Sequence, residues 1–207
     1  MSMSDHDCFD LPLFPLQSVL FPGGLLGLKV FEARYLDLVS DCLRARQPFG
    51  VVALEKGSEL KASTTAVELE RVGCLAELIE VDSPQPGILQ VRCRGTQRFE
   101  IADTTQQSDG LWVARARRLP GDEAVLPSAD LVGSAQGLAN AINTLKQQGS
   151  IPFLEPYHFD EAGWLANRWC EILPISLAAK QKLMELPDPL VRLKLVDDFL
   201  RSKGVVV

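Results

Sequence analysis

Ser176 and Lys180 are the first pair of side chains whose types and spacing could support a reaction. They lie four residues apart, so a helix would place hydroxyl and amine on one face; acyl-transferring enzymes pair serine with lysine at the similar spacing S-x-x-K, which is one residue shorter. The S-D-N and K-T-G motifs that accompany such a pair are missing from the sequence. Ser176 also follows Pro174 at a predicted helix start, where a capping hydroxyl is expected. We therefore interpret Ser176 as a helix cap and predict no catalytic residue.

The segment Asp5-His6-Asp7-Cys8 gathers side chains that could bind a metal ion. It lies in the N-terminal tail, and the only other histidine is His158, so an unstructured tail is favoured over a metal site. The neighbouring acids Asp197 and Asp198 lie in a predicted helix and are expected to face water. No metal and no cofactor are predicted.

Basic residues gather between positions 90 and 118, where six arginines stand against three acidic residues. Exposed ion pairs are common, so the favoured interpretation is a solvent-exposed sheet face whose arginines pair with nearby acids. The alternative is a surface that binds RNA or another anion, although the aromatic side chains nearby are only Phe99 and Trp112. The residues of that alternative are Arg92, Arg94, Arg115 and Arg117, with Arg98 and Arg118 beside them.

The overall charge is acidic, with 21 lysines and arginines against 27 aspartates and glutamates among 207 residues. This balance argues against duplex nucleic acid and anionic membrane surfaces as partners. Five cysteines without a C-x-x-C pair fit a reducing cytoplasm better than a disulfide framework. No run reaches the ~18 apolar residues of a spanning helix, and the N-terminus lacks the features of a signal peptide. We expect a cytoplasmic protein with no membrane partner.

Alternating apolar residues and turn signals predict a β-rich first half. The segment Leu11–Leu16 is apolar on both faces, but its two prolines cannot donate to a ladder, so it fits a sheet edge or the closure of a barrel. In the strand predicted over Val67–Val81, Gly73 marks a bulge or a close approach of two backbones. Further strands are predicted over Leu25–Val30, Phe49–Leu54, Ile88–Gly95 and Leu111–Leu119.

One amphipathic helix is predicted within this first half. Phe31 and Tyr35 open a periodicity of three and four residues, which indicates a helix that begins near Glu32. Aromatic residues at this spacing are more often core than ligand contacts, so both rings are expected to be buried.

The composition changes near Leu119, where helix signals replace the strand patterns. Residues 120–127 contain glycine, prolines and acids, which favours a linker. Beyond them, a serine or aspartate can accept from a free backbone N–H at each of four helix starts. These expected caps are Ser128, Asp160, Ser176 and Asp188. We expect a β-rich subdomain over residues 1–120 and a helical subdomain over residues 121–207.

Several short motifs resemble the substrate-recruiting N-terminal domain of the ATP-dependent Lon protease, a module also found as a free-standing protein and within cereblon. The motifs are LPLFPL, VLFPGG and FEARY in one order, then Gly95–Ile101 as G-x-x-R-F-x-I, and Trp164–Trp169 with Leu177–Glu185 near the end. Together they cover about residues 11–200. The resemblance implies an α+β fold: an N-terminal β-rich, PUA-like pseudo-barrel with one helix, followed by a C-terminal helical bundle.

The resemblance also implies a function, namely a substrate-recognition module that binds exposed or unfolded peptide segments of proteins. The phosphate-binding loop and the serine-lysine protease of a full Lon protease are missing from the sequence, so no reaction is expected. RNA or anion binding and an accessory part in an ATP-dependent proteolytic system are the alternatives. The expected partners are protein or peptide clients, and a protease partner is compatible with this function. The peptide-binding or structural residues that the motifs imply are Phe31, Glu32, Arg34, Tyr35, Arg98 and Phe99.

Overall fold

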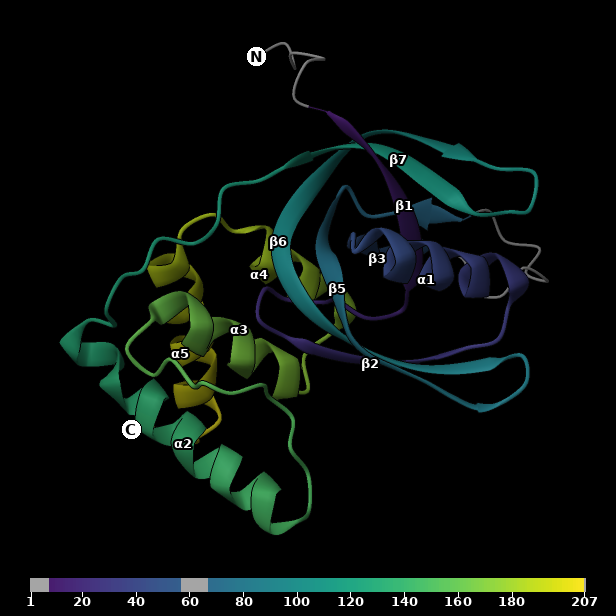
Figure 1. The fold of residues 1–207 in the computed structure, drawn as a ribbon. Coiled ribbons are helices and arrows are strands. Elements are labelled where there is room, and N and C mark those ends of the chain that lie inside the picture. The colour runs from purple at the N-terminus through teal and green to yellow at the C-terminus, as the bar shows by residue number, and fades with distance from the viewer. Residues whose placement is uncertain (1–7, 57–66, 207) are drawn as a thin grey trace. The chain divides into compact units, whose positions relative to one another are not determined.

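The computed structural model describes residues 8–56 and 67–206, and the α+β class predicted from the sequence is confirmed. The chain divides into two compact units, Met1–Pro120 and Gly121–Val207 (Figure 1). The described strands all lie in the first unit together with one helix, and the other helices lie in the second. The segment Asp5-His6-Asp7, considered above for metal binding, lies outside the described residues.

The strands of the first unit form a sheet whose pairing path closes. β1 pairs with β7 in antiparallel and with β3 in parallel, so the order β1-β7-β6-β5-β3 returns to β1. Of the two placements expected for the proline-containing segment Leu11–Leu16, closure is present from Leu13 onward, whereas Leu11 and Pro12 have a described strand on one side only. The elements are β1 (Phe9–Leu16), β2 (Leu25–Val30), α1 (Ala33–Ala45), β3 (Phe49–Lys56), β4 (Glu68–Leu69), β5 (Val72–Gln85), β6 (Ile88–Gln106) and β7 (Trp112–Arg118).

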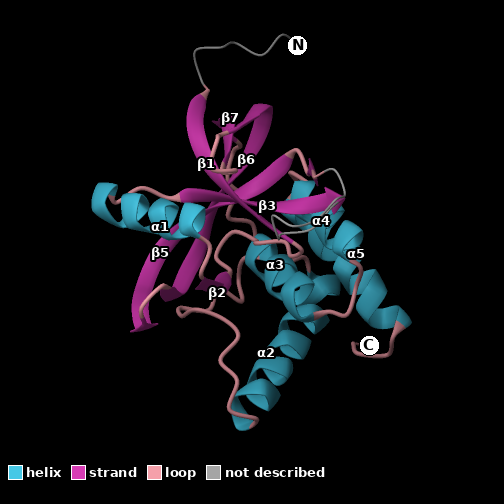
Figure 2. Ribbon diagram, turned by 90° about the vertical axis from the view of Figure 1, so that its right-hand side faces the viewer, coloured by secondary structure: helices cyan, strands magenta, loops and turns pink. Residues whose placement is uncertain are grey.

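Two hydrophobic clusters hold this unit together. The first joins α1 to the strands, and in it the rings of Phe14 and Tyr35 stack with their centroids 4.0 Å apart. Figure 2 shows α1 beside the strands that it covers. The second cluster includes Leu11, Leu13 and Phe99, so the N-terminal half of β1 is packed on β6 side chains. β1 thus belongs to both cores, which fixes its position against α1.

The second unit contains a 3-10 turn and four described α-helices: η2 (Ala129–Leu131), α2 (Val132–Gln147), α3 (Ala162–Ile172), α4 (Leu177–Glu185) and α5 (Pro189–Ser202). Two of the expected caps are confirmed: Ser176 accepts from the N–H of Ala179, and Asp188 accepts from Leu190 and Val191. The other two are wrong in detail. Ser128 precedes the 3-10 turn, and α3 begins one residue later than expected, after Glu161.

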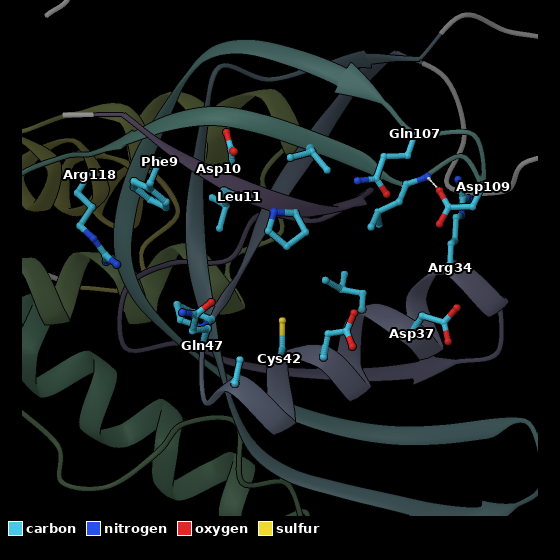
Figure 3. A pocket seen from close by; sticks show the side chains of 17 residues that line it. Phe9, Asp10, Leu11, Arg34, Asp37, Cys42, Gln47, Gln107, Asp109 and Arg118 are labelled. Carbon is cyan, nitrogen blue, oxygen red and sulfur yellow. Dashed lines mark hydrogen bonds between the residues drawn. The ribbon is translucent and has the colours of Figure 1, made fainter. Parts of the chain in front are cut away.

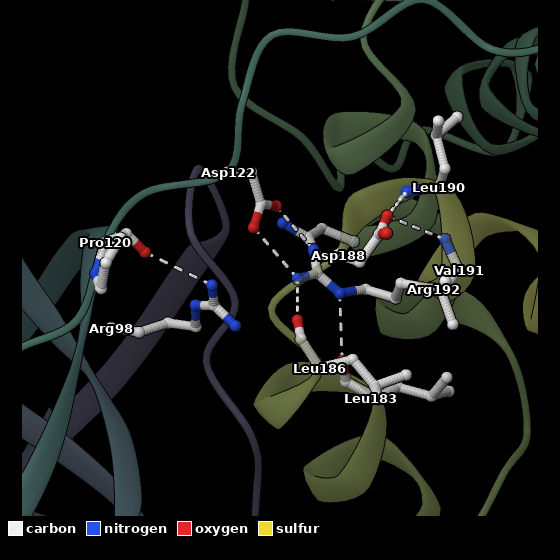
Figure 4. A network of polar contacts seen from close by, with 10 residues as sticks. Arg98, Pro120, Asp122, Leu183, Leu186, Asp188, Leu190, Val191 and Arg192 are labelled. Atoms are coloured by element: carbon white, nitrogen blue, oxygen red, sulfur yellow. Dashed lines mark hydrogen bonds and ion pairs between the residues drawn. The ribbon is translucent and has the colours of Figure 1, made fainter. Parts of the chain in front are cut away.

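Buried charge in the second unit contradicts one expectation. Asp197 is fully buried, where the sequence predicted a side chain in water, because it accepts from Ser134 Oγ at 2.7 Å and from Arg201 Nε at 2.6 Å. The predicted linker, residues 120–127, contains no helix or strand, and two of its residues bind to helices of the second unit. Asp122 pairs with the buried Arg192 (Figure 4). The carbonyl of Val125 accepts from the N–H of Ala162.

None of the described helices has both the length and the apolar composition needed to cross a membrane. Within residues 8–56 and 67–206, no three histidine, cysteine, aspartate or glutamate side chains are grouped closely enough to hold a metal ion.

Candidate functional site

A groove of about 850 Å³ lies within the first unit between α1, the N-terminal half of β1 and the turn that joins β6 to β7. Figure 3 shows its side chains, with Leu11 and the β1 ribbon on one side and Cys42 and Asp37 of α1 on the other. Its volume falls in the range of small-molecule and peptide sites, about 300–1,000 Å³. This groove is the candidate functional site of the unit.

One face of α1 forms a long wall of the groove. The residues on this face recur at three- and four-residue steps, which puts them in one row along a helix. They are Arg34, Asp37, Leu38, Asp41, Cys42 and Ala45. The helix ends at Arg46, whose φ of 52° lies in the left-handed region, and Gln47 and Pro48 then lead into β3 along the groove.

The opposite wall is the N-terminal half of β1. This strand pairs with β7 from Phe9 to Leu13, whereas its pairing with β3 begins only at Leu13. Residues Phe9–Pro12 therefore have a described strand on one side only, and all four line the groove. Backbone N–H and C=O groups on such an open edge are available to another strand.

The floor of the groove is apolar and its rim is charged. Leu11, Leu38 and Cys42 are buried at the floor. Burial, and to a smaller extent the carboxylate of Asp41, raise the pKa of the Cys42 thiol to about 11, so the floor stays uncharged at neutral pH. The charged side chains that line the groove are Asp10, Asp37, Asp41 and Asp109, against Arg34 and Arg118.

Arg34 is the one residue of the FEARY motif that lines this groove. Its guanidinium donates from Nη1 to the carbonyl of Gly110 at 2.7 Å and pairs with Glu32 at 2.9 Å. The bond to Gly110 joins the start of α1 to the turn between β6 and β7. Glu32 precedes the helix but makes no side-chain cap, because its carboxylate is directed to Arg34.

The other motif residues lie in different surroundings. Tyr35 and Phe99 are buried in the two hydrophobic clusters, and Arg98 is buried with its Nη2 donating to the carbonyl of Pro120 at 3.3 Å. Phe31 is 55% exposed, so its expected place in the core is wrong. It precedes the first helical residue, Ala33, and the periodicity of α1 therefore does not set its direction.

The structure of the arginine-rich region agrees with the favoured interpretation, a sheet face on which arginines pair with acidic side chains. Each of the four candidate arginines meets a carboxylate on a neighbouring strand. The pairs are Arg92 with Glu80 at 2.9 Å, Arg94 with Glu77 at 2.6 Å, Arg115 with Asp10 at 3.2 Å and Arg117 with Glu100 at 2.5 Å. An anion would have to displace these acids before it could bind here.

Sequence reasoning missed most of the groove. It identified Arg34, but not Asp37, Asp41 or Ala45, and it gave no role to the β1 edge. The available signal was the spacing of α1, since Arg34 and residues three, seven and eleven positions later share one face of a helix. The open edge of β1 depends on the register at which β3 pairs with it, and no local sequence pattern indicates this register.

Replacing Arg98 by alanine is expected to lower the free energy of unfolding by about 2 kcal/mol, because a buried side chain is removed and the Pro120 carbonyl loses the charged donor of a partly buried hydrogen bond. Urea unfolding followed by circular dichroism measures this change. Arg92→Ala is the matched control, since it removes an exposed pair worth about 0–1 kcal/mol. Unchanged stability of Arg98→Ala combined with lost RNA or anion binding would make Arg98 part of a surface site.

Comparison with known proteins agrees with the fold and the motifs. A Lon protease of Anaeromyxobacter dehalogenans (strain 2CP-C) is 28% identical over 208 residues, which cover 95% of this chain and 24% of that protein. Protein cereblon of Xenopus tropicalis is 31% identical over 127 residues, or 59% of this chain and 26% of that protein. The chain thus spans about a quarter of the length of these relatives.

Two solved structures share the fold. The Lon N-terminal domain protein from Xanthomonas campestris is 30% identical and superposes with a TM-score of 0.75, covering 92% of this chain and 98% of that one. The N-terminal domain of Mycobacterium avium complex Lon protease has a TM-score of 0.62 at 15% identity, with 93% of this chain covered and 98% of that one. Residues 10–202 match the family described as the ATP-dependent protease La (LON) substrate-binding domain. The resemblance drawn from the motifs is confirmed, and the chain belongs to the family of Lon substrate-binding domains.

Proposed function

We propose that this chain is a substrate-recognition module that binds exposed or unfolded peptide segments of proteins and catalyses no reaction itself. The observation that carries the proposal is the match of residues 10–202 to a substrate-binding domain. The groove between α1 and β1 supports it, because a concave site with an apolar floor can accept side chains that are buried in a folded client. Binding of one segment would be weak, since an extended client is ordered as it binds.

Further parts of the proposal concern the fold and the setting. We assign the closed sheet of the first unit to the PUA-like class of pseudo-barrels, and the second unit to a helical bundle. The two units correspond to the subdomains 1–120 and 121–207. The module acts in the cytoplasm in protein quality control, with protein or peptide clients and a protease partner. Phe31 is the one exposed aromatic ring of the FEARY motif and is offered to clients, whereas Tyr35 and Phe99 support the site from the core.

A salt titration tests this function against RNA binding. A fluorescein-labelled unfolded peptide without charge and a single-stranded RNA are titrated at about 50 and 200 mM salt. We expect peptide binding that changes less than about twofold between these conditions, because burial of apolar surface is insensitive to screening. RNA binding that falls about tenfold or more with salt and is abolished by changing Arg92, Arg94 and Arg115 would replace this function, since phosphate neutralisation releases counterions.

Ser176→Ala tests the absence of catalysis. Ser176 Oγ accepts from the N–H of Ala179 at 3.2 Å, so the variant should lose only a helix cap, about 1 kcal/mol of stability. Neither the variant nor the unchanged protein should hydrolyse ATP or cleave casein. Peptide cleavage that is present in the unchanged protein and disappears in Ser176→Ala would contradict the proposal.

A further inference from the structure

We propose that the groove takes its client as an added β-strand along the open edge of β1 at Phe9–Pro12, and that it prefers a segment that carries lysine. This inference rests on the proposed function and specifies the class of client and the manner of its binding.

Among residues 8–56 and 67–206, the pairing of β1 leaves a place for one more strand. β3 runs beside β1 only from the register Leu13↔Gly50 onward, whereas β7 pairs with β1 back to Phe9. The residues that precede β3, Gln47 and Pro48, line the groove and belong to the connection from α1. A client strand would therefore lie beside Phe9–Pro12 in the space that β3 does not occupy, with α1 along its other side (Figure 3).

The backbone of this edge can support the pairing. Successive residues of a strand direct their N–H and C=O groups to opposite sides, so either Phe9 and Leu11 or Asp10 and Pro12 face the groove. Pro12 has no N–H, so Phe9 and Leu11 offer two donors, whereas Asp10 and Pro12 offer a single donor. Each set also offers two carbonyls as acceptors. In both cases the client pairs through every second residue of its own backbone, as in other complexes formed by strand addition.

The charge of the groove selects among extended segments. Arg34 is engaged by Glu32 and by the carbonyl of Gly110, so its charge is compensated within the wall. The carboxylate of Asp37 forms no hydrogen bond or ion pair within residues 8–56 and 67–206. Asp41, one turn further along α1, pairs only with Arg44 at an exposed contact of 2.6 Å. An exposed pair of this kind exchanges readily with a competing cation.

Asp10 and Asp109 add negative charge at the other walls. Asp10 meets Arg115 at 3.2 Å in an exposed pair, and Asp109 accepts from the N–H of Leu111 at the turn between β6 and β7. Arg118 lies at the Phe9 end, where its guanidinium stacks over the ring of Phe9 at 5.1 Å, whereas Figure 3 shows Asp37 and Asp109 at the opposite end. A lysine in the client would thus be favoured at the end near Asp37, and a glutamate disfavoured.

The test uses the full chain and labelled decapeptides in which valine and threonine alternate around two central lysines. One probe carries N-methyl groups on its odd-numbered amides and another on its even-numbered amides, since strand pairing uses only one of the two sets. Fluorescence anisotropy should show about a tenfold loss of affinity for one methylated probe and less than about a twofold loss for the other. Equal losses for both probes would overturn strand addition.

Two pairs of variants locate the site. Ala45→Trp fills the groove from an exposed position on α1 and should weaken binding of the lysine probe about tenfold or more. Ser40→Trp changes an exposed residue of α1 outside the groove and should leave this binding unchanged.

A probe with glutamate in place of lysine should bind about tenfold more weakly at about 50 mM salt. Asp37→Asn combined with Asp41→Asn should reduce this difference to about twofold, whereas the matched pair Asp82→Asn and Asp103→Asn should not.

The outcomes separate this inference from the function on which it rests. If the uncharged unfolded peptide binds, but Ala45→Trp and the aspartate variants change nothing, substrate recognition stands and the β1 groove is not its site. If no peptide binds, the proposed function fails as well. If sedimentation shows a dimer that Ala45→Trp converts to a monomer, a second copy of the chain occupies the edge and the inference is overturned.

Discussion

Replacing Arg192 by methionine is expected to lower the free energy of unfolding of the second unit by about 3–5 kcal/mol. The side chain is 1% exposed, and its guanidinium binds both carboxylate oxygens of Asp122 at 2.6 and 3.0 Å. It also donates to Asn167 Oδ1 at 3.0 Å. The carbonyls of Leu183, at 3.0 Å, and of Leu186 accept from it as well (Figure 4). Methionine has a similar length but no donor, so a carboxylate and three other acceptors would be left without this partner.

The measurement is urea unfolding followed by tryptophan fluorescence, which reports mainly the second unit because Trp164 and Trp169 lie there. Lys194→Met is the matched control on the same helix. It removes exposed contacts to Asp198 and Asp130 and should change stability by less than about 0.5 kcal/mol. Arg192→Lys keeps the charge but not the planar fork and should fall between the two. A loss below about 1 kcal/mol in Arg192→Met would show that the network does not hold the unit together.

Features that depend on neighbours in the sequence could be predicted for this chain. Ser176 and Asp188 accept from N–H groups two or three residues ahead, so the residue type and the start of an apolar pattern are sufficient to identify them. The prolines of Leu11–Leu16 restricted that segment to an edge or a closure for the same local reason. The family resemblance then placed these elements in a known order.

Features that depend on distant partners could not be predicted. The pairing of Arg192 with Asp122 joins residues 70 positions apart, and no pattern near either residue indicates it. Asp197 was expected in water together with its neighbour Asp198, yet Asp197 meets Ser134 and Arg201 in the folded unit. The groove likewise depends on residues that are far apart in the sequence. Its open edge follows from the register at which β3 joins β1, which local propensity does not encode.

Gly73→Ala is expected to destabilise the first unit by about 3 kcal/mol, at the upper end for an overpacked core. A Cβ at this position would lie 2.4 Å from the carbonyl oxygen of Val51 and 2.5 Å from Phe99 Cζ. The backbone of Val51 cannot withdraw, because β3 is paired with β5 at Val51↔Cys74 and with β1 at Phe14↔Val51. The close approach predicted for Gly73 is therefore present, and it brings two strands together over the ring of Phe99.

Gly27→Ala provides the matched control for this substitution. Apart from its neighbours in the chain, no described residue has an atom within 4 Å of a Cβ built at Gly27 in β2, so the change should be neutral or stabilise by up to about 1 kcal/mol through the unfolded chain. Because Phe99 shares a cluster with Leu11 and Leu13, Gly73→Ala should also shift β1 and weaken binding of the lysine probe, whereas Gly27→Ala should not. Thermal unfolding and anisotropy measured on the two variants decide both points. Equal stability of the two variants would contradict the close packing on which the position of the β1 edge depends.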